Sequence, residues 1–563
     1  MPDTCVNIVI GGEAGQGLVT LGDFLAKALV RAGYEIVVTQ DYLSRIRGGH
    51  NTYAIRVSPQ KVHGPRESID LLVALDARTV PLHRAALTGR AMVLADEAID
   101  RMGHPGLSIP FKALCPKPIF ENMAALGVLA RSLCLDRKWF DDLIAETFRR
   151  KGDAVVSGNL KVFSDALAWA NSQQAAFSCM PAPERTEKRL FMHGNDAIAL
   201  GALAAGVNFC SYYPMTPSSS VASTLVEHAQ SMGILVEQAE DEIAAINMAL
   251  GASYAGARVV VPTAGGGFAL MVEGISLAGM TETPIVVVLA QRPGPATGLP
   301  TRTEQGDLNL VLYAGHGDFP RAVFAPGTPE QCFEMTYRAM DQAEKWQSPV
   351  FVLTDQYLAD SYRAVLPFDL SSLPPVSAPA LTTDNPAGYE RYAVTENGVS
   401  PRLVPGFGEH LVVLDSDEHT PDGHITEDLD VRVRMVDKRM RKGLGLKNDV
   451  QPPAFLGDDA PDLLLACWGS TYGPAIEAAQ TLREQGKKTA VLHFGQVYPL
   501  NPDQFLPLLA SARRTVMVEG NFSCQLAALI RQETGYVFGG TISRYDGLPV
   551  TARHILKHLE DAD

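Results

Sequence analysis

Short apolar runs separated by glycine or proline turns and by helical stretches dominate the chain. Strands covered by helices on both faces show this pattern of mostly apolar residues with little alternation. Because strand and helix signals alternate, the sequence predicts α/β domains with mainly parallel sheets. The expected strands are Val6–Ile10, Ala91–Ala95, Arg258–Val261, Ile285–Leu289, Val350–Leu353, Leu463–Cys467, Thr489–His493 and Thr515–Val518.

Two breaks interrupt the alternation. Residues 178–188 are rich in proline and charge, which is typical of a linker. Residues 366–459 carry many prolines and few strand signals, with one short helix expected near Val433–Arg441. The sequence therefore predicts three domains, residues 1–178, 189–365 and 460–563, with an irregular connecting segment over 366–459.

Composition narrows the class of protein. The 563 residues are 46% hydrophobic and 20% charged, which is typical of globular domains with large cores. The net charge of -15 disfavours a nucleic-acid binder or a polybasic membrane-surface protein. No long uncharged apolar run and no signal-peptide pattern occurs. Eight scattered cysteines without a CxxC motif favour a cytoplasmic protein with buried free thiols and no iron–sulfur or zinc motif of its own.

A glycine-rich turn follows the first expected strand and precedes a helix. It reads Gly11-Gly12-Glu13-Ala14-Gly15-Gln16-Gly17. A strand, a glycine turn and a helix N-terminus together favour bound anions. The spacing matches neither the dinucleotide fingerprint nor the P-loop, so a tight turn without a ligand is an equally good interpretation. Downstream, Arg45 and Arg47 beside a glycine pair could bind a carboxylate or phosphate, or could pack against another domain.

Four ordered blocks in the central domain carry the most specific signal. They are Tyr213–Ser219 (YPMTPSS), Glu237–Glu242 (EQAEDE), Thr263–Gly267 (TAGGG) and Arg292–Gln305 (RPGPATGLPTRTEQ). In this order they closely resemble the α subunit of 2-oxoacid:ferredoxin oxidoreductases of the 2-oxoglutarate type. The N-terminal glycine turn and the RGGH block at 47–50 resemble the γ domain of that family, here fused ahead of α. Residues 462–535 resemble its transketolase-C-like domain.

Three positions depart from the commoner family residues, at Met215, Ala264 and Ala296. None of these substitutions removes an ionisable group, so the class of chemistry stays the same.

The resemblance implies roles for individual residues. It makes the central domain the site of the aminopyrimidine of thiamine diphosphate and gives Glu240 the carboxylate that activates this cofactor by proton exchange. Asp241 and Glu242 are alternatives that could simply complement a helix dipole. The same resemblance assigns the oxoacid carboxylate to Thr216 and Arg302. Further cofactor contacts are expected from Tyr213, Pro214, Gly265 and Gly266, and coenzyme A contacts from Gly15, Gln16 and Gly17.

A second subunit is implied as well. The family binds the pyrophosphate of thiamine diphosphate through Mg²⁺ with a GDG motif, and the nearest match here, Gly306-Asp307-Leu308, lacks the second glycine. The resemblance therefore places Mg²⁺ and a [4Fe–4S] cluster on a β subunit, in an (αβ)₂ heterotetramer that reduces ferredoxin. The implied reaction converts a 2-oxoacid, coenzyme A and oxidised ferredoxin to acyl-CoA, CO₂ and reduced ferredoxin.

Several alternatives remain open at the level of sequence. The oxoacid could be pyruvate, a branched-chain oxoacid or an aryl pyruvate, because basic residues for a distal carboxylate, such as Arg45, Arg47, His50 and Lys61, cannot be placed. A non-catalytic assembly subunit of the same fold is a second alternative, and a nucleotide-binding oxidoreductase built on the glycine turn is a third. His410, His419 and His424 with Glu418 have spacings that more often mean solvated or packed side chains than metal ligands.

Overall fold

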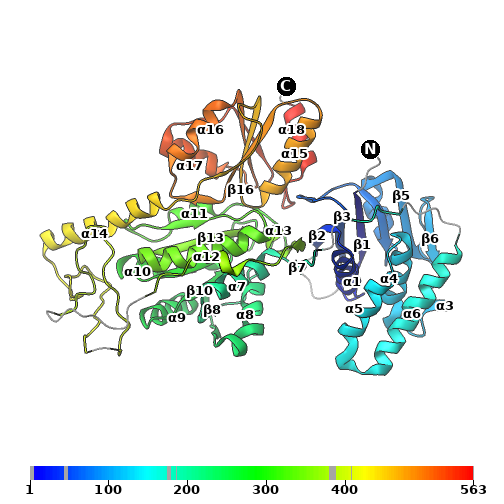
Figure 1. Ribbon diagram of the computed structural model, residues 1–563, viewed down its shortest axis with the longest axis horizontal. Helices are drawn as coiled ribbons and strands as arrows, with labels where there is room; N and C mark the ends of the chain where they lie inside the picture. Colours follow the sequence, from blue (N-terminus) through cyan, green and yellow to red (C-terminus); the bar gives the residue numbers. More distant parts are fainter. Residues whose placement is uncertain are drawn as a thin grey trace. The chain divides into compact units, whose positions relative to one another are not determined.

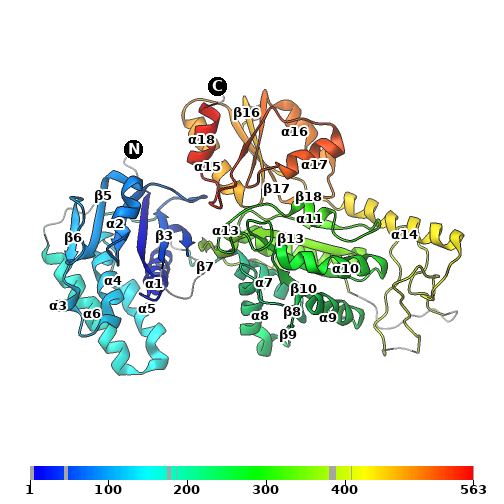
Figure 2. The ribbon, with the colours of Figure 1, turned by 180° about the vertical axis from the view of Figure 1, so that it is seen from behind.

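The computed structural model describes residues 5–42, 49–173, 179–184, 187–378, 388–407 and 409–561. These form two compact units. The first contains residues up to Met192 together with Ser361–Pro367, and the second contains His193–Asp360 together with the chain from Phe368 onward. Three sheets lie in these units, one in the first and two in the second (Figures 1 and 2). The α/β class predicted from the apolar runs is confirmed.

The first unit holds an eight-stranded mixed sheet in the order β6-β5-β4-β1-β3-β2-β14-β7. The half from β6 to β1 is parallel, whereas β3, β2, β14 and β7 pair antiparallel. The strands are β1 (Val6–Glu13), β2 (Glu35–Asp41), β3 (His50–Ser58), β4 (Ile69–Ala74), β5 (Leu87–Asp96), β6 (Gly106–Ile109), β7 (Leu190–Met192) and β14 (Arg363–Val365).

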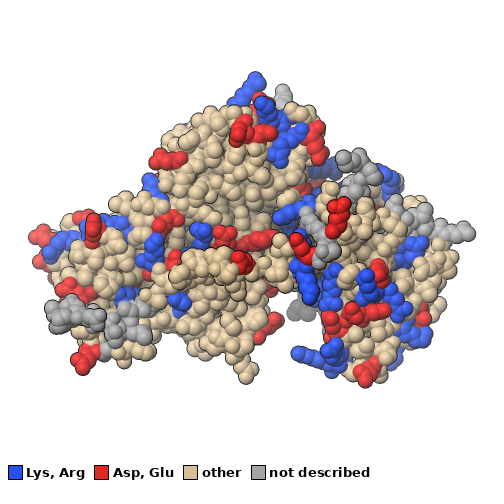
Figure 3. All heavy atoms as spheres, in the orientation of Figure 1, with Lys and Arg blue, Asp and Glu red and all other residues tan. Residues whose placement is uncertain are grey.

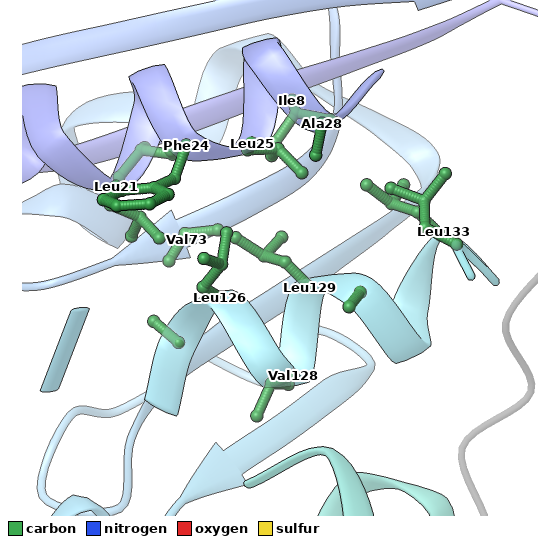
Figure 4. Close-up of a cluster of buried hydrophobic side chains, with 14 of the residues drawn as sticks. Ile8, Leu21, Phe24, Leu25, Ala28, Val73, Leu126, Val128, Leu129 and Leu133 are labelled. Carbon is green, nitrogen blue, oxygen red and sulfur yellow. The ribbon is translucent and has the colours of Figure 1, made fainter. Parts of the chain in front are cut away.

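Helices cover this sheet and close its main core. Leu21, Phe24 and Leu25 of α1 point toward Leu126 and Leu129 of α4, with β1 and β4 behind them (Figure 4). Each fully buried side chain of this size contributes about 1.5–3 kcal/mol. The helices of the unit are α1 (Leu18–Arg31), α2 (Thr79–His83), α3 (Phe111–Leu114), α4 (Glu121–Ser132), α5 (Lys138–Phe148) and α6 (Asp153–Ser172).

The central sheet of the second unit has the order β18-β12-β13-β11-β10-β8-β9. All its strands are parallel except β18, which pairs antiparallel with β12. The strands are β8 (Phe209–Tyr212), β9 (Leu235–Gln238), β10 (Val259–Thr263), β11 (Ile285–Gln291), β12 (Ala322–Phe324), β13 (Pro349–Asp355) and β18 (Gln496–Tyr498). Their flanking helices are α7 (Gly194–Ala204), α8 (Ser219–Met232), α9 (Glu242–Tyr254), α10 (Gly265–Met280), α11 (Leu308–Leu312), α12 (Pro329–Trp346) and α13 (Gln356–Asp360).

The third sheet has the order β15-β17-β16-β19-β20 and shares one hydrophobic core with the central sheet. Phe268 and Phe351 of the central domain belong to the same buried cluster as Trp468 and Phe494. The elements are β15 (Ala454–Gly457), β16 (Leu463–Trp468), β17 (Thr489–Phe494), β19 (Arg514–Glu519), β20 (Gly540–Ser543), α15 (Tyr472–Glu484), α16 (Leu506–Ser511), α17 (Gln525–Thr534) and α18 (Ala552–Glu560). Because the core is shared, the two sheets form one compact unit.

Two sequence expectations need correction. The helix of the connecting segment, α14, runs over Leu429–Asn448 and is much longer than the short stretch predicted near Val433–Arg441, because its buried side interrupts the apolar residues with lysine and arginine. The cysteines are not all buried free thiols either. Cys134 and Cys179 form a disulfide, and Cys5, Cys115 and Cys524 are partly exposed.

Candidate active site

The blocks singled out in the sequence meet at one edge of the central sheet. Tyr213–Pro217 follows β8, Glu240 follows β9, Gly265 follows β10 and Arg292 follows β11. The chain passes from β8 to β9 on one side and then to β10 on the other side of β8, so the direction of winding reverses between β8 and β10. In open α/β sheets, ligands bind in the crevice beyond the carboxyl ends of the strands at such a reversal.

The three adjacent carboxylates of the EQAEDE block have different surroundings. Asp241 is the N-cap of α9, and its side chain accepts a hydrogen bond from the amide of Ala244 at 2.7 Å. Glu242 is buried beneath α10, where its Oε1 would meet any Cβ placed at Gly267. Glu240 is exposed at the carboxyl edge of the sheet. Of the three, Glu240 is the most exposed, Asp241 is half-buried and Glu242 is buried.

The loop after β8 is held from the end of β11, which is two strands away in the sheet. Arg292 Nη1 donates a hydrogen bond of 2.7 Å to the carbonyl of Thr216. Within the loop, Ser218 Oγ donates to the carbonyl of Met215 at 2.8 Å. Tyr213, Pro214 and Thr216 are all exposed. Sequence reasoning did not single out Arg292, although its position immediately after a buried strand is the signal that could have done so.

The N-terminus of α10 approaches an acidic side chain closely. A Cβ at Gly265 would lie 2.6 Å from Oδ2 of Asp307, so glycine is needed there, whereas Gly266 faces more open space. Burial, and to a smaller extent the neighbouring Glu304, raises the pKa of Asp307 to about 7. Oδ2 of Asp307 is buried without a hydrogen-bond partner among the described residues. Asp307 was considered at the sequence level only as part of an incomplete GDG motif.

The loop that carries Arg302 is fastened to the third sheet. The amide of Thr303 donates to the carbonyl of Gly547 at 3.1 Å, and the Cβ of Arg302 lies against Gly547. Two residues farther, Gln305 exchanges hydrogen bonds with Gly520 and donates from Nε2 to the carbonyl of Trp468 at 2.9 Å. Arg302 is therefore positioned by the C-terminal domain, whereas Thr216 is positioned by the central one.

The N-terminal glycine turn belongs to the first unit, whereas the residues described above belong to the second. Gly15 and Gly17 have left-handed φ values of 94° and 74°, and Gly17 precedes α1. Gln16 is used by the fold: its Oε1 accepts from the amide of Glu13 at 2.7 Å and its Nε2 donates to the carbonyl of Leu75 at 3.2 Å. The backbone geometry suits an anion, but the side chain of Gln16 ties the loops after β1 and β4 together.

A pair of histidines accompanies this turn. Nε2 of His50 lies 3.1 Å from Nε2 of His83, and Nδ1 of His50 lies 3.7 Å from Asp76. His83 was not singled out in the sequence, because nothing in its local pattern connects it to the RGGH block. Arg45 and Arg47, which could bind an anion or pack against another domain, lie outside the described residues.

The distribution of surface charge and the predicted metal candidates involve residues beyond the blocks described above. Acidic and basic side chains are interspersed on the face of the described residues seen in Figure 3. Glu418 accepts bidentate hydrogen bonds of 2.9 and 2.8 Å from Arg439, and His419 stacks on Tyr392. Within the described ranges, no group of three or more His, Cys, Asp or Glu side chains is arranged to hold a metal ion. No helix among those residues is both long and apolar enough to cross a membrane.

Comparison with known families agrees with these three sheets. Residues 7–169 match the model described as pyruvate ferredoxin/flavodoxin oxidoreductase. Residues 200–438 match the thiamine-diphosphate-binding domain of pyruvate flavodoxin/ferredoxin oxidoreductases. Residues 456–561 match the transketolase C-terminal domain.

Individual relatives extend over almost the whole chain. The α subunit of a 2-oxoacid:ferredoxin oxidoreductase from Sulfolobus sp is 30% identical, over 96% of this chain and 94% of the relative. The 2-oxoglutarate oxidoreductase subunit KorA of Mycobacterium tuberculosis is 28% identical over 93% of this chain and 87% of its own. A solved structure of the 2-oxoglutarate:ferredoxin oxidoreductase from Magnetococcus marinus, with 2-oxoglutarate, coenzyme A and succinyl-CoA bound, superposes with a TM-score of 0.92 at 30% identity, covering 99% of each chain. The chain therefore belongs to the 2-oxoacid:ferredoxin oxidoreductase family, as an α subunit with the γ domain fused at its N-terminal side.

Proposed function

We propose that this chain supplies the aminopyrimidine-binding and oxoacid-binding half of an enzyme that acts on 2-oxoglutarate. The reaction joins 2-oxoglutarate and coenzyme A, with oxidised ferredoxin as electron acceptor, to give succinyl-CoA, CO₂ and reduced ferredoxin. The observation that carries the proposal is the exposed carboxylate of Glu240 at the switch point of the central sheet, beside two acidic residues that the fold uses elsewhere. The substrate bound in the Magnetococcus marinus structure supports 2-oxoglutarate over other oxoacids.

The residues at this edge fit the aminopyrimidine end of thiamine diphosphate. When bound, this cofactor supplies the carbon nucleophile and the electron sink for decarboxylation. Glu240 would share a proton with the ring nitrogen of a bound pyrimidine, because a carboxylate can both accept and return such a proton. Tyr213, Pro214, Gly265 and Gly266 are assigned to the approach, and the open space at Gly266 allows a ring to come close to the backbone of α10.

Thr216 and Arg302 bind the carboxylate next to the reacting carbonyl. The Thr216 hydroxyl donates one hydrogen bond, and the guanidinium of Arg302 offers two parallel N–H donors. Arg292 keeps the Thr216 loop in place through the carbonyl of that residue. Arg302 is fastened to the third sheet, whereas Thr216 belongs to the central domain. The distance between the Arg302 guanidinium and the Thr216 hydroxyl therefore depends on the contact between the central and C-terminal domains.

A β subunit completes the enzyme in this proposal. It binds the pyrophosphate through Mg²⁺, carries a [4Fe–4S] cluster and passes electrons to ferredoxin, in an (αβ)₂ heterotetramer. The name "subunit alpha" of the relatives supports a partner of this kind. Coenzyme A is assigned to the glycine turn of the first unit, where Gly15 and Gly17 leave backbone amides near a helix N-terminus; Gln16 contributes by shaping the loop.

The test is co-expression with a β subunit of the same family, followed by turnover with a panel of oxoacids and ferredoxin or methyl viologen as acceptor. We expect the highest kcat/KM with 2-oxoglutarate and no turnover by the chain alone. A preference for pyruvate, branched-chain or aryl oxoacids would correct the substrate. Failure of a carefully assembled complex to decarboxylate any oxoacid would favour an assembly role and overturn the proposal.

A further inference from the structure

A buried amide contacts the loop that carries Thr216. Asn195 is the second residue of α7 and is 0% exposed, whereas Thr216 is exposed. Nδ2 of Asn195 donates two hydrogen bonds of 2.8 Å, one to the carbonyl of Pro217 and one to Oγ of Ser220. Both hydrogens of this amide nitrogen are therefore used on the loop after β8 and on the first turn of α8.

The fold keeps this amide at an energetic cost. Oδ1 of Asn195 is buried and has no hydrogen-bond partner among the described residues, and an unsatisfied buried acceptor is unfavourable. Turning the amide over would place Oδ1 against the carbonyl of Pro217, so that two acceptors would face each other. An apolar side chain would remove the buried acceptor but would leave that carbonyl without its donor. The two donated hydrogen bonds therefore explain why an amide stands at this position.

The start of α7 holds Asn195 in one place. His193 is the N-cap: its Nδ1 accepts from the amide of Asp196 at 3.0 Å, and Oδ2 of Asp196 accepts from the amide of His193 at 3.3 Å. A Cβ at Gly194 would lie 2.5 Å from the carbonyl oxygen of Leu358, so the start of the helix packs directly on the backbone of α13. The amide that contacts the loop thus belongs to a part of α7 that is fixed on two sides.

Two side chains from different elements hold consecutive carbonyls of the loop. Arg292, directly after β11, donates to the carbonyl of Thr216 at 2.7 Å, and Asn195 donates to the carbonyl of Pro217. Because each peptide unit is planar, fixing these carbonyls also fixes the Cα atoms of Thr216 and Pro217. The hydroxyl of Thr216 is then left mainly with rotation about χ1 of its own side chain.

We propose that Asn195 is a positioning residue for the binding of the oxoacid. Its amide is buried and both of its donors are used, so it acts through the backbone of the loop and keeps the Thr216 hydroxyl where it meets the oxoacid carboxylate. This inference rests on the role proposed above for Thr216. That contact is made in the bound substrate and in the transition state alike, so loss of Asn195 should raise KM and leave kcat nearly unchanged.

The first test is kinetic and uses the full chain assembled with a β subunit of the same family. N195A removes both donated hydrogen bonds, and we expect the KM of the oxoacid to rise about 10-fold with little change in kcat. S220A is the matched control, because it removes one acceptor of the same amide and leaves the bond to the Pro217 carbonyl; its KM should stay close to that of the wild type. A wild-type KM of N195A, or an equal rise in S220A, would overturn the proposal.

The second test asks whether Asn195 acts through Thr216. T216V removes the hydroxyl, and N195A should add nothing to the KM of T216V if the two residues act as one unit. Additive effects would mean that Asn195 acts in another way. An unchanged KM of T216V would overturn the role of Thr216 and this inference together, whereas a raised KM of T216V with an unchanged KM of N195A would overturn this inference alone.

A third comparison separates positioning from loosened packing. T224V removes the hydrogen bond of 2.9 Å from Oγ1 of Thr224 to Oδ1 of Asp196, which also joins α8 to α7 but does not involve the loop. It should lower Tm without raising KM, and a KM raised as much as in N195A would refute the positioning role. Should N195A fail to assemble, N195S, whose side chain is too short to reach the Pro217 carbonyl, takes its place with the same expected rise in KM.

Discussion

Gln305 and Gly520 exchange two hydrogen bonds. The amide of Gln305 donates to the carbonyl of Gly520 at 2.7 Å, and the amide of Gly520 donates to Oε1 of Gln305, also at 2.7 Å. This reciprocal pair joins the loop of Arg302 to the strand end of β19, so the position of the proposed oxoacid contact depends on the C-terminal domain.

Replacing Gln305 should therefore affect both stability and substrate binding. Q305A leaves the Gly520 amide and the Trp468 carbonyl without partners, at a cost on the order of 3 kcal/mol. We expect a lower Tm and a higher KM for the oxoacid. Q504A is the control, since Gln504 also donates to a backbone carbonyl, that of Val450, but lies outside the Arg302 loop. A KM raised equally by both variants would mean that general loosening is responsible.

Two substitutions distinguish Glu240 from the neighbouring Asp241 as the carboxylate that takes part in proton transfer. E240Q should lower turnover by about 10²–10⁴-fold, because the proton transfer is lost, while thermal unfolding stays unchanged. D241A should show the opposite: the N-cap of α9 is lost at about 1 kcal/mol, but turnover is retained. Turnover and Tm measured on both variants decide the matter, and near-normal activity of E240Q would end the assignment.

Arg302 should act on substrate affinity. R302A should raise the KM of the oxoacid by about 10–100-fold, the equivalent of one charge-assisted hydrogen bond. The KM of R302K should lie between those of the wild type and R302A, because lysine keeps the positive charge but lacks the planar guanidinium with its two parallel donors. R513A is the control, because Arg513 is exposed and directly precedes β19, at the opposite end of that strand from Gly520. If R302A changed only Tm, the arginine would have a structural role alone.

Much of this arrangement was predictable from the sequence. Each of the eight apolar runs lies in a strand, because short runs rich in β-branched residues and leucine suit strands that are covered on both faces. The four blocks of the central domain follow strands that lie in one sheet, and their assignment to the cofactor and the oxoacid stays a prediction. What could not be predicted depends on contacts between distant residues. Arg292 holds Thr216 across the switch point, and Lys438 and Lys442 are buried only because Glu282 lies opposite them.

Asp307 should make stability depend on pH in an unusual direction. Its pKa is raised from 3.8 to about 7 in the folded chain, chiefly by burial. The native state therefore holds this proton where the unfolded state has lost it. The contribution of this proton to the free energy of unfolding is complete below pH 3.8 and is lost as the pH rises toward about 7. D307N, which stays neutral, should flatten this part of the curve of unfolding free energy against pH; a slope identical to wild type would contradict the expectation.

The buried carboxylate of Glu282 should be indispensable for the connecting segment. Burial opposes its charge, but Lys442, Lys438 and Arg391 outweigh burial and hold its pKa at about 2. E282Q leaves two buried ammonium groups without a countercharge, and we expect a loss of about 3–5 kcal/mol in the free energy of unfolding. E146Q removes the exposed ion pair with Arg31 and should cost at most about 1 kcal/mol. Denaturant titrations of both variants provide the comparison.

Strands β7 and β14 of the first sheet come from the two ends of the central domain in the sequence. Leu190–Met192 and Arg363–Val365 close one edge of that sheet, yet they are the segments by which the chain enters and leaves the central domain. The ladder of β2, β14 and β7 therefore joins, within the first unit, segments that precede and follow the central domain in the sequence. A gene split within residues 179–187 would leave this edge to be completed between two polypeptides, by strand addition alone. Fusion of the γ and α modules turns that intermolecular step into an intramolecular one and fixes their stoichiometry at one to one.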